Sequence, residues 1–170
     1  MIDRIPTAAA DDERLVITRL FDAPRDRVFA AWTAAEHWAR WFQPDGCTTS
    51  SCTLDARPGG RLRFKVSFGG MEFWQGGTYR EVLAPERLVF TLRFEDEDGN
   101  IVSPTMLGLS EQFPREQVVT VTFVEGNGKT QLTLEQIVPL DVPERDGMLL
   151  GFTSALDKLD ALLTAGETNP

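Results

Sequence analysis

The spacing of apolar residues changes several times along the chain, and each change marks a new type of element. Residues 14–22 are rich in β-branched and apolar side chains, which predicts a first strand. Residues 25–33 and 35–42 carry apolar side chains at helical spacing, so they predict two short helices. Pro24 suits the beginning of the first of these helices.

After residue 46 the apolar period changes from helical spacing to two. The clearest stretch is 61–68, where Leu62, Phe64, Val66 and Phe68 alternate with polar residues. One face of such a strand is buried and the other is exposed to solvent, which is typical of an antiparallel sheet. The same reasoning predicts strands at 47–56, 61–68, 72–82, 87–95, 117–125 and 129–138.

Two irregular features interrupt these strands. The pair Gly76 and Gly77 predicts a β-bulge inside the 72–82 strand. Residues 96–116 break the alternation with acidic residues, glycine, serine and two prolines, so we expect a long surface loop there. The acidic run 95–98 is interpreted as a solvated part of that loop.

The chain ends in a long amphipathic stretch, 143–164, whose apolar residues recur at a period of 3.6. At 1.5 Å per residue this helix would be about 33 Å long. Asp141 and Glu144 resemble a capping box at its beginning. Gly147 and Gly151 lie one turn apart on it, and each costs about 1 kcal/mol relative to alanine. We therefore expect these glycines to allow close packing or to leave open space.

The order of elements is one strand, two short helices, six strands and one long helix, which defines an α+β fold. A curved antiparallel sheet whose apolar face meets the long helix is the architecture we expect. The sequence contains no repeat and no linker, so we assign residues 13–166 to one domain with its long loop at 96–116. Residues 1–12 are expected to form a disordered tail.

Charge and cysteine content narrow the classes of partner. The 170 residues include 17 lysines and arginines and 26 acidic residues, for a net charge of −9. An acidic chain is repelled by phosphate backbones, so nucleic acid and anionic membranes are not expected partners. No apolar run approaches the roughly 20 residues of a membrane helix, and we expect a cytoplasmic protein. Cys47 and Cys52 are expected to be free thiols that hold no metal, and no cofactor motif is present.

Two sequence motifs resemble a known family. Residues 21–46 (FDAPRDRVFAAWTAAEHWARWFQPDG) and 76–94 (GGTYREVLAPERLVFTLRF) follow each other in the order of the activator-of-Hsp90-ATPase-like branch of the START/Bet v 1-like (SRPBCC, polyketide cyclase-like) superfamily. The resemblance covers roughly residues 14–164, although the loop at 96–116 is longer and more acidic than the family pattern.

The resemblance implies a helix-grip fold, in which about seven antiparallel strands wrap around a long C-terminal helix. It also implies a cavity for a hydrophobic small molecule between sheet and helix. Members of the superfamily include lipid carriers, cyclases and co-chaperone domains, and the fold alone does not select among them. Binding of an aromatic or lipid-like molecule is the leading hypothesis. The alternatives are a cyclase or isomerase acting on a polar aromatic in the same cavity, and a co-chaperone-like domain that binds a protein partner. The sequence leaves open whether the chain forms a homodimer through the 96–116 loop or a strand edge.

The candidate ligand-binding residues come from the short helices, the apolar sheet face and the long helix. Trp32 is expected in the core, whereas for Trp41 and Phe42 the sequence leaves pocket wall and core equally open. The complete set is Trp41, Phe42, Phe64, Val66, Phe68, Trp74, Phe90, Phe123, Gly151, Phe152 and Leu156.

Catalytic candidates are few. His37 is the only histidine and has no partner nearby in the sequence, so it is at most a weak candidate for acid–base work. Tyr79 and Arg80 are the other weak candidates, because an inward arginine would bind a carboxylate or phenolate. Other polar side chains that could point inward are Glu72, Gln75, Glu135 and Gln136.

Overall fold

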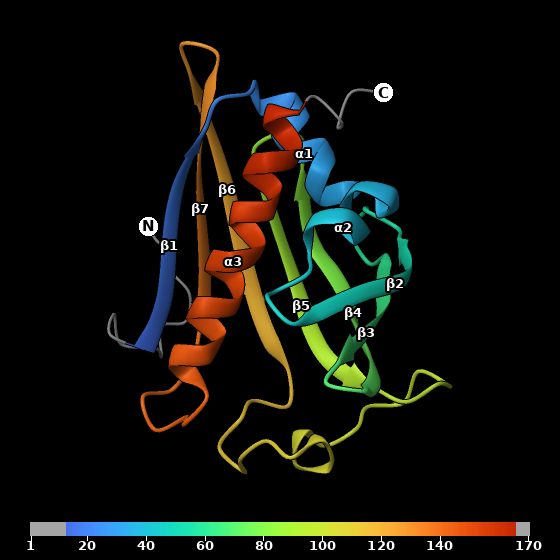
Figure 1. Ribbon diagram of the computed structural model, residues 1–170. Helices are drawn as coiled ribbons and strands as arrows, with labels where there is room; N and C mark the ends of the chain where they lie inside the picture. Colours follow the sequence, from blue (N-terminus) through green and yellow to red (C-terminus); the bar gives the residue numbers. More distant parts are fainter. Residues whose placement is uncertain (1–12, 166–170) are drawn as a thin grey trace.

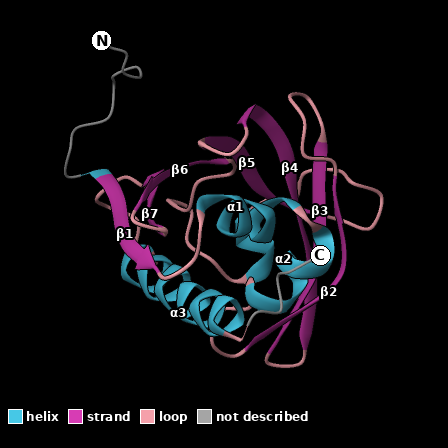
Figure 2. Cartoon of the chain, turned by 90° about the horizontal axis from the view of Figure 1, so that it is seen from above, coloured by secondary structure: helices cyan, strands magenta, loops and turns pink. Residues whose placement is uncertain are grey.

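A seven-stranded antiparallel sheet curves around three helices in the computed structural model, which describes residues 13–165 (Figures 1 and 2). The predicted tail at 1–12 lies outside the described residues. The strands, in the order β1-β7-β6-β5-β4-β3-β2, are β1 (Arg14–Phe21), β7 (Lys129–Ile137), β6 (Gln117–Gly126), β5 (Arg87–Glu95), β4 (Met71–Leu83), β3 (Arg61–Phe68) and β2 (Cys47–Leu54).

The helices all lie on the concave face of this sheet. Helices α1 (Arg25–Thr33) and α2 (Ala35–Trp41) cover one end of it, and the long helix α3 (Arg145–Thr164) crosses in front of the sheet (Figure 1). Seen from above, the sheet wraps around the three helices (Figure 2). The α+β class and the helix-grip fold are therefore confirmed.

The alternation in β3 puts Leu62, Phe64 and Val66 in the core, as the sequence predicts. The fourth apolar residue, Phe68, is half exposed because it lies at the tip of the β3–β4 hairpin. No helix in the part of the chain that the structure describes is long and apolar enough to cross a membrane.

The tryptophans of α1 and α2 form the centre of the core. The Trp32 ring lies 4.7 Å from that of Trp41 and 5.8 Å from that of Trp38, centroid to centroid, and all three are buried. Trp38 stacks on Phe42 at 4.3 Å, and the indole nitrogen of Trp41 donates to the carbonyl oxygen of Ala31. These contacts hold the two short helices together and against the sheet.

The two cysteines of β2 share the inner face, although an unbroken strand would place them on opposite faces. Ser51 has a positive φ of 46°, and the pairing of β2 with β3 shifts register between Ser50 and Thr53. This bulge turns Cys52 inward, so both thiols pack against the core, and both are free.

The bulge predicted at Gly76 and Gly77 lies elsewhere, because the pairing of β4 with β5 shifts register between Tyr79 and Glu81. The two glycines instead permit close approach. A Cβ atom on Gly77 would lie 1.8 Å from the backbone oxygen of Thr91. A Cβ atom on Gly76 would lie 2.5 Å from the carboxylate of Glu95.

Glu95 is not a solvated loop residue, as its place in the acidic run suggested. It ends β5 on the outer face of the sheet, and its side chain is fully buried. Its carboxylate accepts hydrogen bonds from Arg61, Arg63 and Arg93 at 2.9–3.1 Å. Two guanidinium groups from β3 and one from β5 itself therefore offset the cost of burying this charge.

The 96–116 segment is more than a surface loop. It contains the 3-10 helix η2 (Pro104–Leu107), and Phe113 is buried against Phe94. Phe113 belongs to a second apolar cluster with Leu15, Val138 and Val142. The segment therefore packs against the end of the sheet where α3 begins, at the bottom of Figure 1.

Helix α3 begins at Arg145, two residues later than predicted, and the expected capping box does not form. Glu144 precedes the helix but makes no side-chain cap to it. Its carboxylate instead accepts hydrogen bonds from the backbone nitrogen and the hydroxyl of Ser110, at 2.7 and 2.8 Å. Glu144 therefore ties the long loop to the beginning of α3.

Candidate functional site

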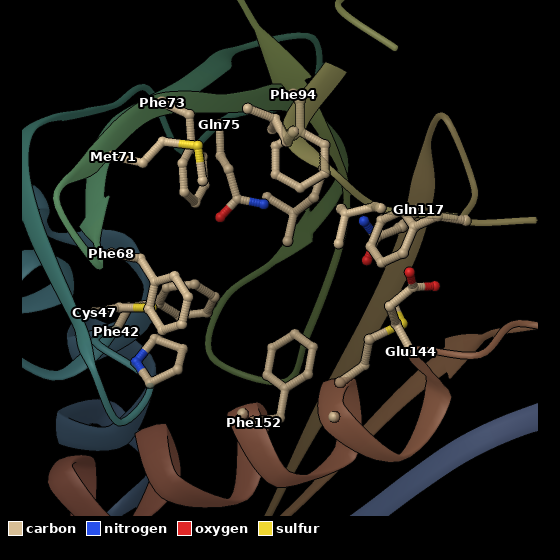
Figure 3. A pocket seen from close by; sticks show the side chains of 18 residues that line it. Phe42, Cys47, Phe68, Met71, Phe73, Gln75, Phe94, Gln117, Glu144 and Phe152 are labelled. Carbon is tan, nitrogen blue, oxygen red and sulfur yellow. The ribbon is translucent and has the colours of Figure 1, made fainter. Parts of the chain in front are cut away.

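A pocket of about 410 Å³ opens where the beginning of α3 faces the β3–β4 hairpin and the long loop (Figure 3). That volume is within the range of pockets that hold small organic molecules. Its lining residues are Phe42, Pro44, Cys47, Phe68, Met71, Phe73, Gln75, Leu92, Phe94, Leu107, Leu109, Phe113, Gln117, Glu144, Gly147, Met148, Gly151 and Phe152.

The pocket wall is mainly aromatic. Six of its residues are phenylalanines, contributed by the α2–β2 turn, the hairpin, β5, the long loop and α3. Several of the rings meet edge to face, with 5.5 Å between the centroids of Phe73 and Phe94 and 5.8 Å between those of Phe42 and Phe152. These contacts hold the phenylalanine rings in place, and the rings present apolar surface to the pocket.

Three polar side chains interrupt this wall. Gln75 extends from β4 into the cavity, whereas Gln117 and Glu144 lie on the side opposite Phe42 and Phe68 (Figure 3). The amide oxygen of Gln117 accepts a hydrogen bond from the buried amide of Gln136.

Within residues 13–165, Glu144 is the one lining residue that carries a formal charge. Burial opposes ionisation of its carboxyl group, but the two hydrogen bonds from Ser110 outweigh burial and lower the pKa of Glu144. A carboxyl with a lowered pKa is ionised at neutral pH. The pocket is therefore apolar with one negatively charged side.

The two glycines of α3 leave space in this pocket. A Cβ atom on Gly147 would meet nothing within 4 Å, and one on Gly151 would meet only Pro44, at 3.7 Å. Of the two roles expected from the sequence, open space therefore agrees with the structure and close backbone packing does not.

Four of the eleven residues predicted to bind ligand line the pocket: Phe42, Phe68, Gly151 and Phe152. Six others are buried in the main core cluster instead: Trp41, Phe64, Val66, Phe90, Phe123 and Leu156. The reason is that the aromatic rings of α1 and α2 pack on rings of β3 and β5, such as Trp38 on Phe64 and Trp32 on Phe90, and fill the space there.

Trp74 lies on the outer face of β4, whereas the pocket lies on the inner face of the sheet. Its ring lies beneath the guanidinium group of Arg63, which is 4.0 Å from the ring centroid, on the outer face of the sheet. Its pairing with Lys65 in the β3–β4 register places it among the polar residues of that face.

None of the three catalytic candidates lines the pocket. Arg80 is exposed and pairs with Glu116 at 3.6 Å, so it is a solvated charge on β4 and does not point into the pocket. Tyr79 is buried in the core, where burial, followed by the nearby Cys52 and Asp55, raises its pKa and keeps the phenol neutral. His37 is half-buried on α2.

Several lining residues were missed by the sequence analysis, above all Leu107, Leu109 and Phe113 of the long loop. These three apolar residues fall within seven positions of a loop rich in acidic residues, and they were the available signal that this loop packs on the rest of the domain. Glu144 was interpreted as a helix cap. Gln117 had no signal in the sequence. Among residues 13–165, no three His, Cys, Asp or Glu residues are grouped so that they could hold a metal ion.

Comparison with known proteins supports this architecture. Residues 22–164 match the family model described as activator of Hsp90 ATPase homolog 1-like protein. Among curated proteins, none matches the chain.

Solved structures with the same fold cover nearly the whole chain. A protein from Mycobacterium smegmatis is 26% identical with a TM-score of 0.75, over 91% of this chain and 93% of that one. A protein from Chromobacterium violaceum is 25% identical with a TM-score of 0.71, over 89% and 96% of the two chains. An AHSA1 protein from Silicibacter pomeroyi, at 24% identity and a TM-score of 0.68, covers 90% and 99% and shares the fold.

Proposed function

Because the chain belongs to the activator of Hsp90 ATPase homolog 1-like family, we propose that it binds a small hydrophobic molecule in the pocket between its sheet and α3. Family and fold together support a ligand-binding or co-chaperone-type domain. The observation that favours a ligand is the cavity of about 410 Å³ with its six phenylalanines. An empty cavity lowers stability because its wall forfeits packing contacts, and a bound hydrophobic ligand would restore them.

The first experiment is native mass spectrometry of the protein purified from its own host, followed by extraction and identification of any bound molecule. A stoichiometric hydrophobic ligand supports the proposal. Its loss in Gly151→Leu, which adds a side chain inside the pocket, would place the ligand there. Ala161→Leu is the matched control, because it adds a similar side chain at an exposed position of the same helix. An empty protein with no thermal shift across an aromatic and lipid library overturns the proposal.

A co-chaperone-type role is the second candidate, and exposed apolar side chains near the pocket favour it. Phe68 is 50% exposed, Met71 41% and Met106 76%. Such residues at a pocket mouth can contact a protein partner as well as a ligand. The test is the ATPase rate of an Hsp90 from the same host with and without this protein. An unchanged rate rejects this role and leaves the ligand proposal standing.

An enzyme of the cyclase or isomerase type has less support, because the candidates His37, Tyr79 and Arg80 lie outside the pocket lining. The proposal places the protein in the cytoplasm, where its two thiols would stay reduced. A homodimer stays a prediction that sedimentation velocity can test, with both β1 and β2 at open edges of the sheet.

A further inference from the structure

The charge distribution around the pocket selects among hydrophobic ligands. We propose that the ligand is an aromatic or alkyl molecule whose polar group is neutral or cationic, and that carboxylates and phosphates are excluded. This inference rests on the proposed function, because it names the ligand class that the same pocket takes.

Glu144 places a fixed negative charge at the pocket wall. Ser110 holds both oxygens of its carboxylate through two hydrogen bonds, so the charge stays beside the cavity. An anionic ligand would bring a second negative charge into a pocket walled by apolar side chains. The two like charges repel each other, and an anion would also lose its water contacts in the apolar pocket without gaining a compensating partner.

No lysine, arginine or histidine is among the described residues that line the pocket. The two nearest basic residues on α3 have other partners. Arg145 donates to the carbonyl oxygens of Val138 and Arg14, at 3.3 and 3.4 Å. Lys158 donates to the carbonyl oxygen of Gln43 and lies 3.3 Å from the carboxylate of Asp45. A carboxylate ligand would therefore meet no counter-ion in the pocket wall.

The pocket wall can interact favourably with cationic and neutral polar groups. The faces of aromatic rings attract cations, and six phenylalanines line this pocket. The amide of Gln75, which extends into the cavity, can both donate a hydrogen bond to and accept one from a neutral alcohol or amide. The wall thus suits cationic and neutral groups and provides nothing that compensates an anion.

Three probes that share one ring system test this inference. They are 2-naphthylmethylamine, 2-naphthylmethanol and 2-naphthoate, which are cationic, neutral and anionic at pH 7. Two unit charges about 6 Å apart at an effective dielectric constant of about 40 change an equilibrium constant about tenfold. Isothermal titration calorimetry should therefore show the amine and the alcohol binding at least about tenfold more tightly than naphthoate.

Variants assign the preference to Glu144. Glu144→Gln keeps an oxygen that can accept from Ser110 and removes the charge, so both the attraction for the amine and the repulsion of naphthoate are lost. Each is worth about tenfold, so the ratio of amine to naphthoate affinity should fall about a hundredfold. Asp141→Asn is the matched control: it removes the same charge from an exposed residue outside the pocket and should leave the ratio unchanged.

Naphthoate binding as tightly as the amine, or a ratio that Glu144→Gln does not change, overturns the ligand class while the pocket proposal stands. If none of the three probes binds, the proposed function itself fails.

Discussion

Substitutions of Gly151 test whether this glycine keeps the pocket open or permits close packing of α3. This glycine lies in the second turn of α3, facing the cavity, and its helix would be more stable with almost any other residue. Alanine adds one carbon that would sit 3.7 Å from Pro44, at ordinary contact distance. We therefore expect Gly151→Ala to stabilise the protein, and Gly151→Leu to stabilise it similarly while it fills the pocket.

The size of the effect follows from helix propensity. Glycine costs about 1 kcal/mol relative to alanine in a helix interior. For a chain of 170 residues this corresponds to a rise in Tm of about 2–4 °C. The added leucine atoms would occupy space now open to a ligand, and we expect the affinity for 2-naphthylmethanol to fall at least about tenfold, the cost of losing one or two buried methylene contacts.

Differential scanning calorimetry measures the first effect and isothermal titration calorimetry the second, both on ligand-free protein. The reasoning is refuted if Gly151→Ala lowers Tm, because then the glycine serves close packing rather than open space. It is equally refuted if Gly151→Leu is stable and binds the probe as the wild type does, because the open space would then lie elsewhere.

Four further predictions concern the carboxylates and the thiols. Replacing Glu95 by alanine removes the carboxylate that three arginines share and should lower the free energy of unfolding by about 3 kcal/mol in urea titrations, whereas no change would mean that solvent screens the cluster. A bound ligand should slow maleimide alkylation of Cys47 in a Cys52→Ser variant, since Cys47 lines the pocket; equal rates would contradict this. Burial, opposed by a nearby lysine, raises the pKa of the Cys47 thiol, so its alkylation rate should still be rising above pH 9. Burial opposes ionisation of Glu144, but the hydrogen bonds from Ser110 lower the pKa of Glu144 below the ordinary value of 4.5. The contact between Ser110 and Glu144 therefore stabilises the fold fully above pH 4.5. This stabilisation is lost as the pH falls through the lowered pKa. The difference in Tm between wild type and Glu144→Gln should therefore shrink as the pH is lowered. A difference that is constant from pH 7 to pH 3 would contradict a stabilising role of the ionised Glu144.

The strands and helices were predictable because their signals are local. Alternation in β3 and the 3.6 period in α3 each reflect which face of an element is buried, and the structure confirms Phe64, Val66, Phe152 and Leu156 as buried. The order of elements then leaves few ways to cover the sheet, so the α+β class follows from the chain itself. The family motifs narrowed this to the helix-grip fold.

The division of the apolar residues into core and pocket was not predictable, because both need the same kind of side chain. Phe64 and Phe68 lie on the same face of one strand, yet one packs under the tryptophans and the other reaches the pocket mouth. Whether each phenylalanine lies in the core or at the pocket depends on its distance from α2. The tertiary structure sets that distance, because it depends on how the sheet curves. The sequence pattern records that a side chain is apolar, not what lies opposite it.

What the sequence by itself determined is the set of elements, their buried faces and the fold they build. What only the tertiary structure decided is the site: the long loop closing one end of the sheet, Ser110 holding Glu144 beside the cavity, and the bulge at Ser51 that turns Cys52 inward. These features depend on contacts between segments far apart in the chain. Local propensity carries no record of such contacts, because they arise only when the sheet curves and brings its ends to the helix.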